Sequence, residues 1–298
     1  MQNRPGMWVV AAMVGLTLLV GGCRRGYDQS TPQAVLQTAK QMVQKGDASR
    51  LTELVYADSP KMRQFLDEIG IVMGSLQDLG KAVQKAYPEE IAKLKAEAEE
   101  SAKKGEASSF ISRMAGQATQ QMGGLGKRPP KGAAPADPDA MRKTFDNAMK
   151  EVFADPYGWI ASNETRLTAQ TVADDQAVIL WDGKPALGIG LTMKKGDDDK
   201  WYIVLPTNAP GVAQIMPKTD ESWEIMGSLM DVFDNMLHDL TKDVESGKAR
   251  KLDSLATMAG EKAFVPAVMV FFAYSQAIQA DKKAAKEAAK TQPSAPPK

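Results

Sequence analysis

Cysteine and histidine are almost absent from this chain. Its 298 residues contain one cysteine, Cys23, and one histidine, His238. A single cysteine cannot form an intramolecular disulfide, so the fold has to be held together by burial of apolar side chains. A single histidine excludes metal sites built from several histidines, and no glycine-rich phosphate loop is present. We therefore expect no resident metal and no cofactor.

A net charge is also missing. The chain has 37 basic and 37 acidic residues, and Arg4 is the only charged residue among residues 1–22. Without that segment the balance is 36 basic against 37 acidic residues. Recognition of nucleic acid normally depends on a basic surface, which this composition does not supply. We therefore expect no nucleic-acid partner.

The first apolar run is too short to span a bilayer. Residues 7–20 are uncharged, but they number 14, and a spanning helix needs about 20. A basic residue before a short apolar run, with small residues after it, is the arrangement of an export signal. An ordinary cleaved signal and an uncleaved membrane anchor are the alternatives, and Cys23 would be incidental in both.

The end of this run, Val20-Gly21-Gly22-Cys23, resembles the lipobox of bacterial lipoproteins. The resemblance implies that the thiol of Cys23 carries diacylglycerol, that the signal is cut between Gly22 and Cys23, and that the new amino group receives a fatty acid such as palmitate. Two or three acyl chains make a stable anchor, whereas one binds only marginally. The implied partner is membrane lipid. The implied location is the cell membrane or outer membrane, facing the periplasm or the exterior.

Composition divides the chain into six stretches. Gly, Pro, Ala and Lys dominate one internal stretch, and the C-terminus contains three prolines. The predicted parts are a signal peptide (1–22), a lipid-anchored tether (23–30), an N-terminal helical region (31–122), a flexible linker (123–138), a region with one helix, an antiparallel sheet and C-terminal helices (139–290), and a disordered tail (291–298).

Helix-starting residues precede the predicted sheet. Thr31-Pro32 and Ser59-Pro60 each place a capping hydroxyl before a proline in the first turn. Gly46 ends the first helix, and Asp47 is expected to cap a short second one. The third helix extends to Pro88, because its apolar residues keep a helical spacing until there.

Four short segments predict strands, at residues 165–172, 176–181, 186–194 and 200–205. The turns between them are short, which favours an antiparallel meander. The flanking amphipathic helices are the available cover for one face of such a sheet. We expect an α+β domain that is mostly helical, with a central four-stranded antiparallel meander and helices before and after it.

Helices resume at Asp220, and two more are expected at residues 249–259 and about 264–289. Residues 263–280 carry no charge, a length at which a membrane span is conceivable. Pro266 and three polar residues dilute this run, so we predict a buried helix of the soluble domain instead. The similarity of residues 46–54 to 247–255 indicates either a duplicated helical unit or a coincidence of helix-ending glycines, and we favour the coincidence.

Three segments, Thr31-Pro32-Gln33-Ala34-Val35, Gly46-Asp47 and Lys200-Trp201-Tyr202-Ile203, resemble parts of nuclear transport factor 2-like domains. In that family, helices and a curved antiparallel sheet enclose a cone-shaped pocket, which hosts enzymes in some members and only binding in others. The resemblance covers residues 31–55 and 164–205. It implies a pocket between sheet and helices, although the helices after residue 220 depart from the family pattern.

Few residues are candidates for chemistry. Asp234 and His238 share a helix face, but two ligands do not make a zinc site, so we interpret them as a surface pair. The run Asp197-Asp198-Asp199 lacks the spacing of a calcium loop, so we interpret it as a solvated turn.

Trp181 and Trp201 lie on the predicted sheet and are core residues first and candidate ligand contacts second. The leading interpretation is a non-catalytic binding or scaffold protein of the cell envelope that holds an apolar ligand or an envelope protein. The alternative is an envelope hydrolase or isomerase, with Asp175 or Asp182 at the sheet rim as its base.

Overall fold

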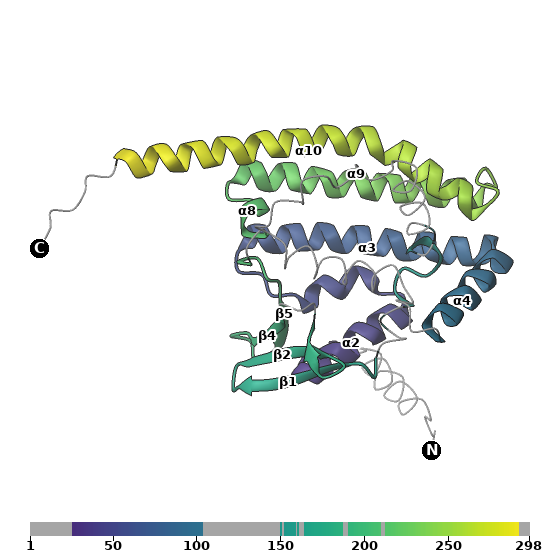
Figure 1. Cartoon of the computed structure of the whole chain (residues 1–298), viewed down its shortest axis with the longest axis horizontal. Helices are drawn as coiled ribbons and strands as arrows, with labels where there is room; N and C mark the ends of the chain where they lie inside the picture. The colour runs from purple at the N-terminus through teal and green to yellow at the C-terminus, as the bar shows by residue number, and fades with distance from the viewer. Residues whose placement is uncertain are drawn as a thin grey trace, which may run out of the picture.

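The computed structural model describes residues 26–103, 150, 152–158, 160, 164–186, 190–209 and 212–291. The lipobox-like segment with Gly22 and Cys23 and the linker predicted over 123–138 lie outside these ranges. Within them the elements are stacked (Figure 1): the sheet lies beside α2, α3 crosses the middle of the molecule, and α9 and α10 lie on the far side.

The first helix, α2, spans Pro32–Lys45. The hydroxyl of Thr31 accepts a hydrogen bond from the backbone N–H of Ala34 at 3.1 Å, and Gly46 ends the helix in the left-handed conformation with φ 84°. Both predictions are confirmed. Asp47 is at the predicted N-cap position of the next element, the 3-10 helix η1 at Ala48–Leu54, but its side chain makes no capping hydrogen bond. The Asp47 carboxylate instead accepts a hydrogen bond from the hydroxyl of Tyr27.

The long helix α3 spans Pro60–Ala86, and α4 spans Pro88–Lys103. The hydroxyl of Ser59 accepts a hydrogen bond from the N–H of Met62 at 3.2 Å, which confirms the predicted start of α3. A proline in the first turn costs no hydrogen bond, so Pro60 and Pro88 can each begin a helix.

An antiparallel sheet follows, as predicted. Its strands are β1 (Leu167–Ala173), β2 (Gln176–Trp181), β3 (Lys184–Pro185), β4 (Leu191–Lys195) and β5 (Trp201–Val204). The order is β1-β2-β4-β5, and β3 also pairs with β2. The third predicted strand, 186–194, corresponds to β4, which begins at Leu191 directly after Gly190, a residue whose φ of 74° lies outside strand geometry.

Both outer strands of the sheet have neighbours that are not strands. At β1, the N–H of Ala169 donates to the side-chain carbonyl of Gln33 at 3.0 Å. At β5, the N–H of Tyr56 donates to the carbonyl of Ile203 at 2.8 Å, and Val55 forms a parallel bridge with the same residue. The chain that joins η1 to α3 therefore continues the sheet beyond β5.

Two clusters of buried apolar side chains form the core. The first lies between the sheet, α2 and η1, and the second lies among α3, α4, α9, α10 and residues 153–154. Leu76 of α3 packs against both clusters. The helix α3 is therefore a wall that the two clusters share.

The C-terminal helices are α8 (Val212–Ile215), α9 (Asp220–Glu245) and α10 (Leu252–Thr291). The prediction of two separate helices after α9 is wrong, because α10 is continuous and contains Pro266. A proline inside a helix costs about 3 kcal/mol. Buried residues on both sides of it, such as Leu255 and Tyr274, attach α10 to the body and offset that cost.

The prediction of a buried helix at residues 263–280 is also wrong. Tyr274 and Ala277 are buried, but five large apolar side chains of this stretch are half exposed or more. We call these five the α10 strip: Val265, Val268, Met269, Phe271 and Phe272. The cause is the place of α10 at the outside of the helical layer, where α9 covers only one of its sides (Figure 1). No helix in the described ranges is both long enough and apolar enough to cross a membrane.

Candidate functional site

The helices α3 and α9 run side by side in the same direction. Near their starts, Lys61 lies 3.9 Å from Asp220, and further along the hydroxyl of Ser75 donates to Asp234 at 2.5 Å. Gly227 of α9 allows a close approach, because a Cβ atom at that position would lie 2.6 Å from Oε2 of Glu68. A pocket opens between the first halves of these two helices.

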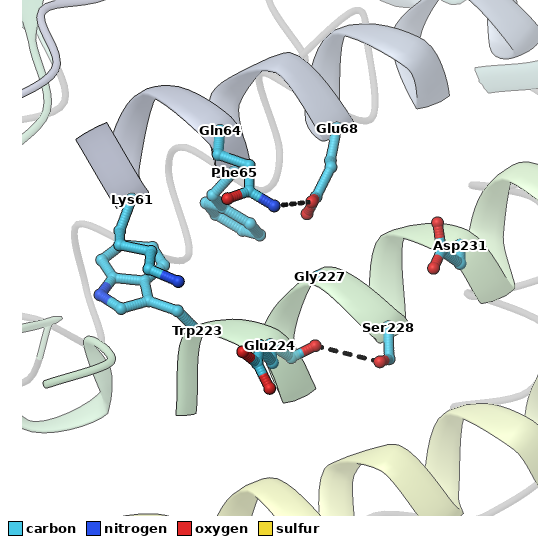
Figure 2. Close-up of a pocket in the computed structure, with 9 residues that line it drawn as sticks. All are labelled: Lys61, Gln64, Phe65, Glu68, Trp223, Glu224, Gly227, Ser228 and Asp231. Carbon is cyan, nitrogen blue, oxygen red and sulfur yellow. Dashed lines mark hydrogen bonds between the residues drawn. The ribbon is translucent and has the colours of Figure 1, made fainter. Parts of the chain in front are cut away.

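This α3–α9 pocket has a volume of about 180 Å³. Figure 2 shows Phe65 and Glu68 of one helix directed toward the other, and Trp223 of the second helix directed toward Lys61 of the first. Its lining combines aromatic, acidic and amide side chains with one lysine: Lys61, Gln64, Phe65, Glu68, Trp223, Glu224, Gly227, Ser228 and Asp231.

An aromatic pair forms one wall of the pocket. The rings of Phe65 and Trp223 have centroids 5.6 Å apart and planes inclined by 57°. Trp223 lies in the first turn of α9, whose start is fixed by a capping box between Thr219 and Ser222. Tilted rings at this distance attract each other, so each ring helps to hold the other in place.

Carboxylates dominate the rest of the lining. Glu68 accepts a hydrogen bond from the side-chain amide of Gln64 at 3.3 Å, and Glu224 and Asp231 lie on the facing helix. The hydroxyl of Ser228 donates to the backbone carbonyl of Glu224 at 3.0 Å, so this serine is not paired with a base. The arrangement is suited to binding a ligand through charge and ring contacts.

The sequence predicted a helix from Asp220 but did not indicate the pocket. The pairing of Phe65 with Trp223 joins two helices that are far apart in the chain, and neither helix start contains a motif that indicates the other. The acidic residues follow ordinary helical spacing and gave no separate signal.

The structure does not bring Trp181 and Trp201 together. Both face the core side of the sheet, but they lie near opposite ends of it, about 20 Å apart at 3.3 Å per residue. Trp201 is buried; its N–H donates to the backbone carbonyl of Gln29 at 2.8 Å, and its carbonyl accepts from the side-chain amide of Gln29 at 2.9 Å. The guanidinium of Arg166 covers the ring of Trp181 at 4.7 Å. Neither tryptophan lines the α3–α9 pocket.

The two candidate bases at the sheet rim do not converge either. Asp175 precedes β2 and Asp182 follows it, so they lie at opposite ends of that strand. The Arg166 guanidinium donates to both oxygens of Asp182 and thereby lowers the pKa of that carboxyl. A carboxylate with a lowered pKa is a poorer proton acceptor near neutral pH.

Asp234 and His238 form the expected surface pair, with Nδ1 of the imidazole 3.4 Å from Oδ1 of the carboxylate. The structure adds Ser75, whose hydroxyl lies 3.5 Å from the same Nδ1. In a catalytic triad the imidazole stands between serine and carboxylate and uses both nitrogens. Here both partners face one nitrogen, so His238 cannot pass a proton between them.

The acidic turn 197–199 is engaged by neighbouring basic and phenolic groups. Asp198 accepts from the hydroxyl of Tyr202 at 2.7 Å and pairs with Lys200 at 3.1 Å, and Asp199 pairs with Lys195 at 2.8 Å. Burial, with help from Asp198, raises the pKa of Tyr202 to about 12. The described ranges contain no group of three or more His, Cys, Asp or Glu residues that could hold a metal ion.

The chain becomes part of the folded body only a few residues after Cys23. The ring of Tyr27 lies under the guanidinium of Arg50 at 4.7 Å, and its hydroxyl donates to Asp47. Gln29 is bound to the first residue of β5. Much of the tether predicted over 23–30 is therefore attached to the domain.

No family model, curated protein or solved structure matches this chain.

Proposed function

We propose that this chain is an exported, lipid-anchored protein of the cell envelope that binds a ligand or partner without catalysing a reaction. The observation that carries the proposal is the lipobox-like Val20-Gly21-Gly22-Cys23, which ends at the only cysteine of the chain. The domain would belong to the cell membrane or outer membrane and face the periplasm or exterior.

The position of Tyr27 supports an anchor at Cys23. Three residues lie between the two positions, so an extended chain over these four steps bridges about 14 Å at most. Arg24 and Arg25 would lie within that distance of the lipid, where each basic side chain contributes about 1 kcal/mol against an anionic surface. A lipid at Cys23 would therefore hold the folded body close to the bilayer.

The state of the candidate catalytic groups supports binding over catalysis. The carboxylate of Asp182 accepts hydrogen bonds from the guanidinium of Arg166. The hydroxyl of Ser75 donates its hydrogen to Asp234, so it does not donate to the imidazole of His238. The α3–α9 pocket, with its ring wall and carboxylates, offers a ligand both ring and charge contacts. We take this pocket as the binding site of the module.

The anchor is tested by Cys23→Ser and by mass spectrometry of the mature N-terminus. We expect wild-type protein to begin at Cys23 with added acyl mass and to sediment with membranes, whereas Cys23→Ser is released to the soluble fraction. The matched control adds Ser30→Cys to Cys23→Ser. It restores a cysteine seven residues away, and it should remain soluble if position 23 itself is the lipid site. An unmodified Cys23 in mature protein, or complete membrane sedimentation of Cys23→Ser, would contradict the proposal.

A further inference from the structure

The chemistry of the α3–α9 pocket indicates which ligands it can accept. The ring faces of tryptophan and phenylalanine carry partial negative charge and attract cations placed over them. Phe65 and Trp223 are only partly buried and both line the pocket, so a ligand inside it contacts them. This wall favours a cation over an anion.

The charge of the lining favours a cation as well. Glu68, Glu224 and Asp231 line the pocket together with one lysine, Lys61, whose ammonium lies 3.9 Å from the carboxylate of Asp220. The lining therefore has three carboxylates and one ammonium, and that ammonium is already near Asp220. The excess negative charge lies in a recess, where the electrostatic field is stronger than on a flat surface.

The helix dipoles do not reverse this preference. Both helices begin at the Lys61 end of the pocket, and helix N-termini attract anions, but that effect fades within the first turn. Glu68 lies about two turns after the start of α3, and Asp231 about three turns after the start of α9. The carboxylates that face the middle of the pocket are therefore outside the reach of the dipoles.

The volume limits the size of the ligand. Sites for whole small molecules usually enclose about 300 Å³ or more, and this pocket encloses about 180 Å³. A group of that size is one side chain or the end of a linear amine, with the rest of the ligand outside.

We propose that the α3–α9 pocket binds an organic cation, an alkylammonium or guanidinium group, between the rings of Phe65 and Trp223 and the carboxylate of Glu68. The inference rests on the proposed function and names the ligand class of its binding site. Such a group is supplied by a basic side chain of a peptide or by a free polyamine.

The experiment is calorimetric titration of the purified full-length protein in detergent, at about 10 mM ionic strength, where charges act over about 30 Å. The probes are spermidine and three peptides with blocked ends. Gly-Arg-Gly carries the cation, and Gly-Leu-Gly and Gly-Glu-Gly are the matched neutral and acidic peptides. We expect the cationic probes to bind and the neutral and acidic peptides not to bind. Stronger binding of the arginine peptide identifies a protein side chain as the source, and stronger binding of spermidine identifies a free amine.

Two variants examine the pocket itself. Glu68→Gln removes the central charge and should weaken binding of the cations about tenfold. Gly227→Ala places a methyl group 2.6 Å from Oε2 of Glu68, which moves the flexible end of that side chain and should weaken binding to a similar degree without unfolding the protein. Glu245→Gln makes the same charge change on an exposed residue at the far end of α9 and should leave binding unchanged.

Several results would overturn the inference: no binding of either cation, equal affinity for Gly-Leu-Gly, or wild-type affinity in Glu68→Gln with an unchanged melting temperature. The anchor is judged separately, because Cys23→Ser should bind the probes as the wild type does. Lipid-modified protein that binds no cation refutes the pocket inference alone, and unmodified protein that binds cations refutes the anchor alone.

Discussion

At the scale of single residues, Gln77 is a polar side chain that joins α3 to both α2 and η1. It is buried, its carbonyl accepts from the N–H of Ala48 at 3.0 Å, and its amide donates to the carbonyl of Val43 at 3.0 Å. Gln77→Ala should lower the free energy of unfolding by about 1–3 kcal/mol, because it leaves a buried N–H without a partner. Urea denaturation measures this loss. Gln41→Ala, at an exposed position of α2, should change stability by less than about 0.5 kcal/mol, and equal losses would refute the assignment.

Asp243 gives stability a dependence on pH. It is buried at the end of α9, with its oxygens 3.0 Å from Nζ of Lys248 and 3.3 Å from Nζ of Lys262. The hydrogen bond from Lys248, followed by the nearby ammonium of Lys262, lowers the pKa of Asp243. Its contribution is therefore complete above the unfolded-state pKa of about 3.9 and is lost as pH falls through the lower folded-state value.

Asp243→Asn should accordingly melt at a lower temperature than wild type at pH 7, and the difference should shrink toward pH 3. Thermal unfolding followed by circular dichroism at several pH values measures it. Asp239→Asn removes an exposed partner of Lys262 and should have a small effect at every pH. A difference for Asp243→Asn that stays constant down to pH 3 would contradict the assignment.

Local signals were predictable from the sequence where a few adjacent residues decide the structure. The caps at Thr31 and Ser59 and the stop at Gly46 depend only on neighbours in the chain. Asp47 shows the limit, because its carboxylate is taken by Tyr27, twenty positions earlier. A partner at that separation leaves no periodic trace in the sequence.

At the scale of elements, glycine has opposite consequences in two helices. A Cβ at Gly70 of α3 would lie 2.4 Å from the carbonyl oxygen of Ser49 and 2.9 Å from Oγ1 of Thr52, whereas one at Gly260 of α10 meets nothing within 4 Å. Gly70→Ala should therefore destabilise the protein by about 1–3 kcal/mol, because η1 has to move away. Gly260→Ala should stabilise it by up to about 1 kcal/mol through helix propensity. Denaturant midpoints compare the two, and stabilisation by both would disprove the close contact between α3 and η1.

The α10 strip predicts tolerance to polar substitution. Phe272 is 64% exposed, so Phe272→Ser should change the free energy of unfolding by less than about 0.5 kcal/mol and should raise the solubility of the protein. Leu255, on the packed side of the same helix, is fully buried, and Leu255→Ala should cost about 2–5 kcal/mol. Chemical denaturation of both variants provides the measurement. A cost above about 2 kcal/mol for Phe272→Ser would mean that another part of the chain covers the strip.

The position of the α10 strip on the outside of the fold also explains why the prediction of a buried helix was wrong. An uncharged run ordinarily indicates a core helix, and the sequence alone does not reveal that α10 ends up outside α9. The continuity of α10 through Pro266 was missed for a related reason, since contacts of Leu255 and Tyr274 with other parts of the fold outweigh the local penalty.

At the scale of the whole molecule, α3 couples the sheet to the helical layer. Leu76 packs against both core clusters, so neither cluster can open without exposing part of the other. We expect one cooperative transition, with the same midpoint by tryptophan fluorescence, to which Trp181 and Trp201 of the sheet and Trp223 of α9 contribute, and by far-ultraviolet circular dichroism, which is dominated by the helices. Midpoints that differ beyond error would indicate two independently stable units.

The fold class was predictable at this scale, and the site was not. Turn residues between short strands were sufficient for the antiparallel meander, because successive strands pair with each other. The α3–α9 pocket depends on how two distant helices approach across Gly227, which is a property of the assembled core.

The two outer strands bear on how copies of this protein behave beside one another. A strand with free N–H and carbonyl groups can pair with a strand of another molecule and start aggregation. On one border the side chain of Gln33 accepts a hydrogen bond from the N–H of Ala169. On the other border the N–H of Tyr56 donates to the carbonyl of Ile203. A strand that adds at either border would have to displace the residue bound there, so these two residues help the domain remain dispersed even when many copies are crowded together.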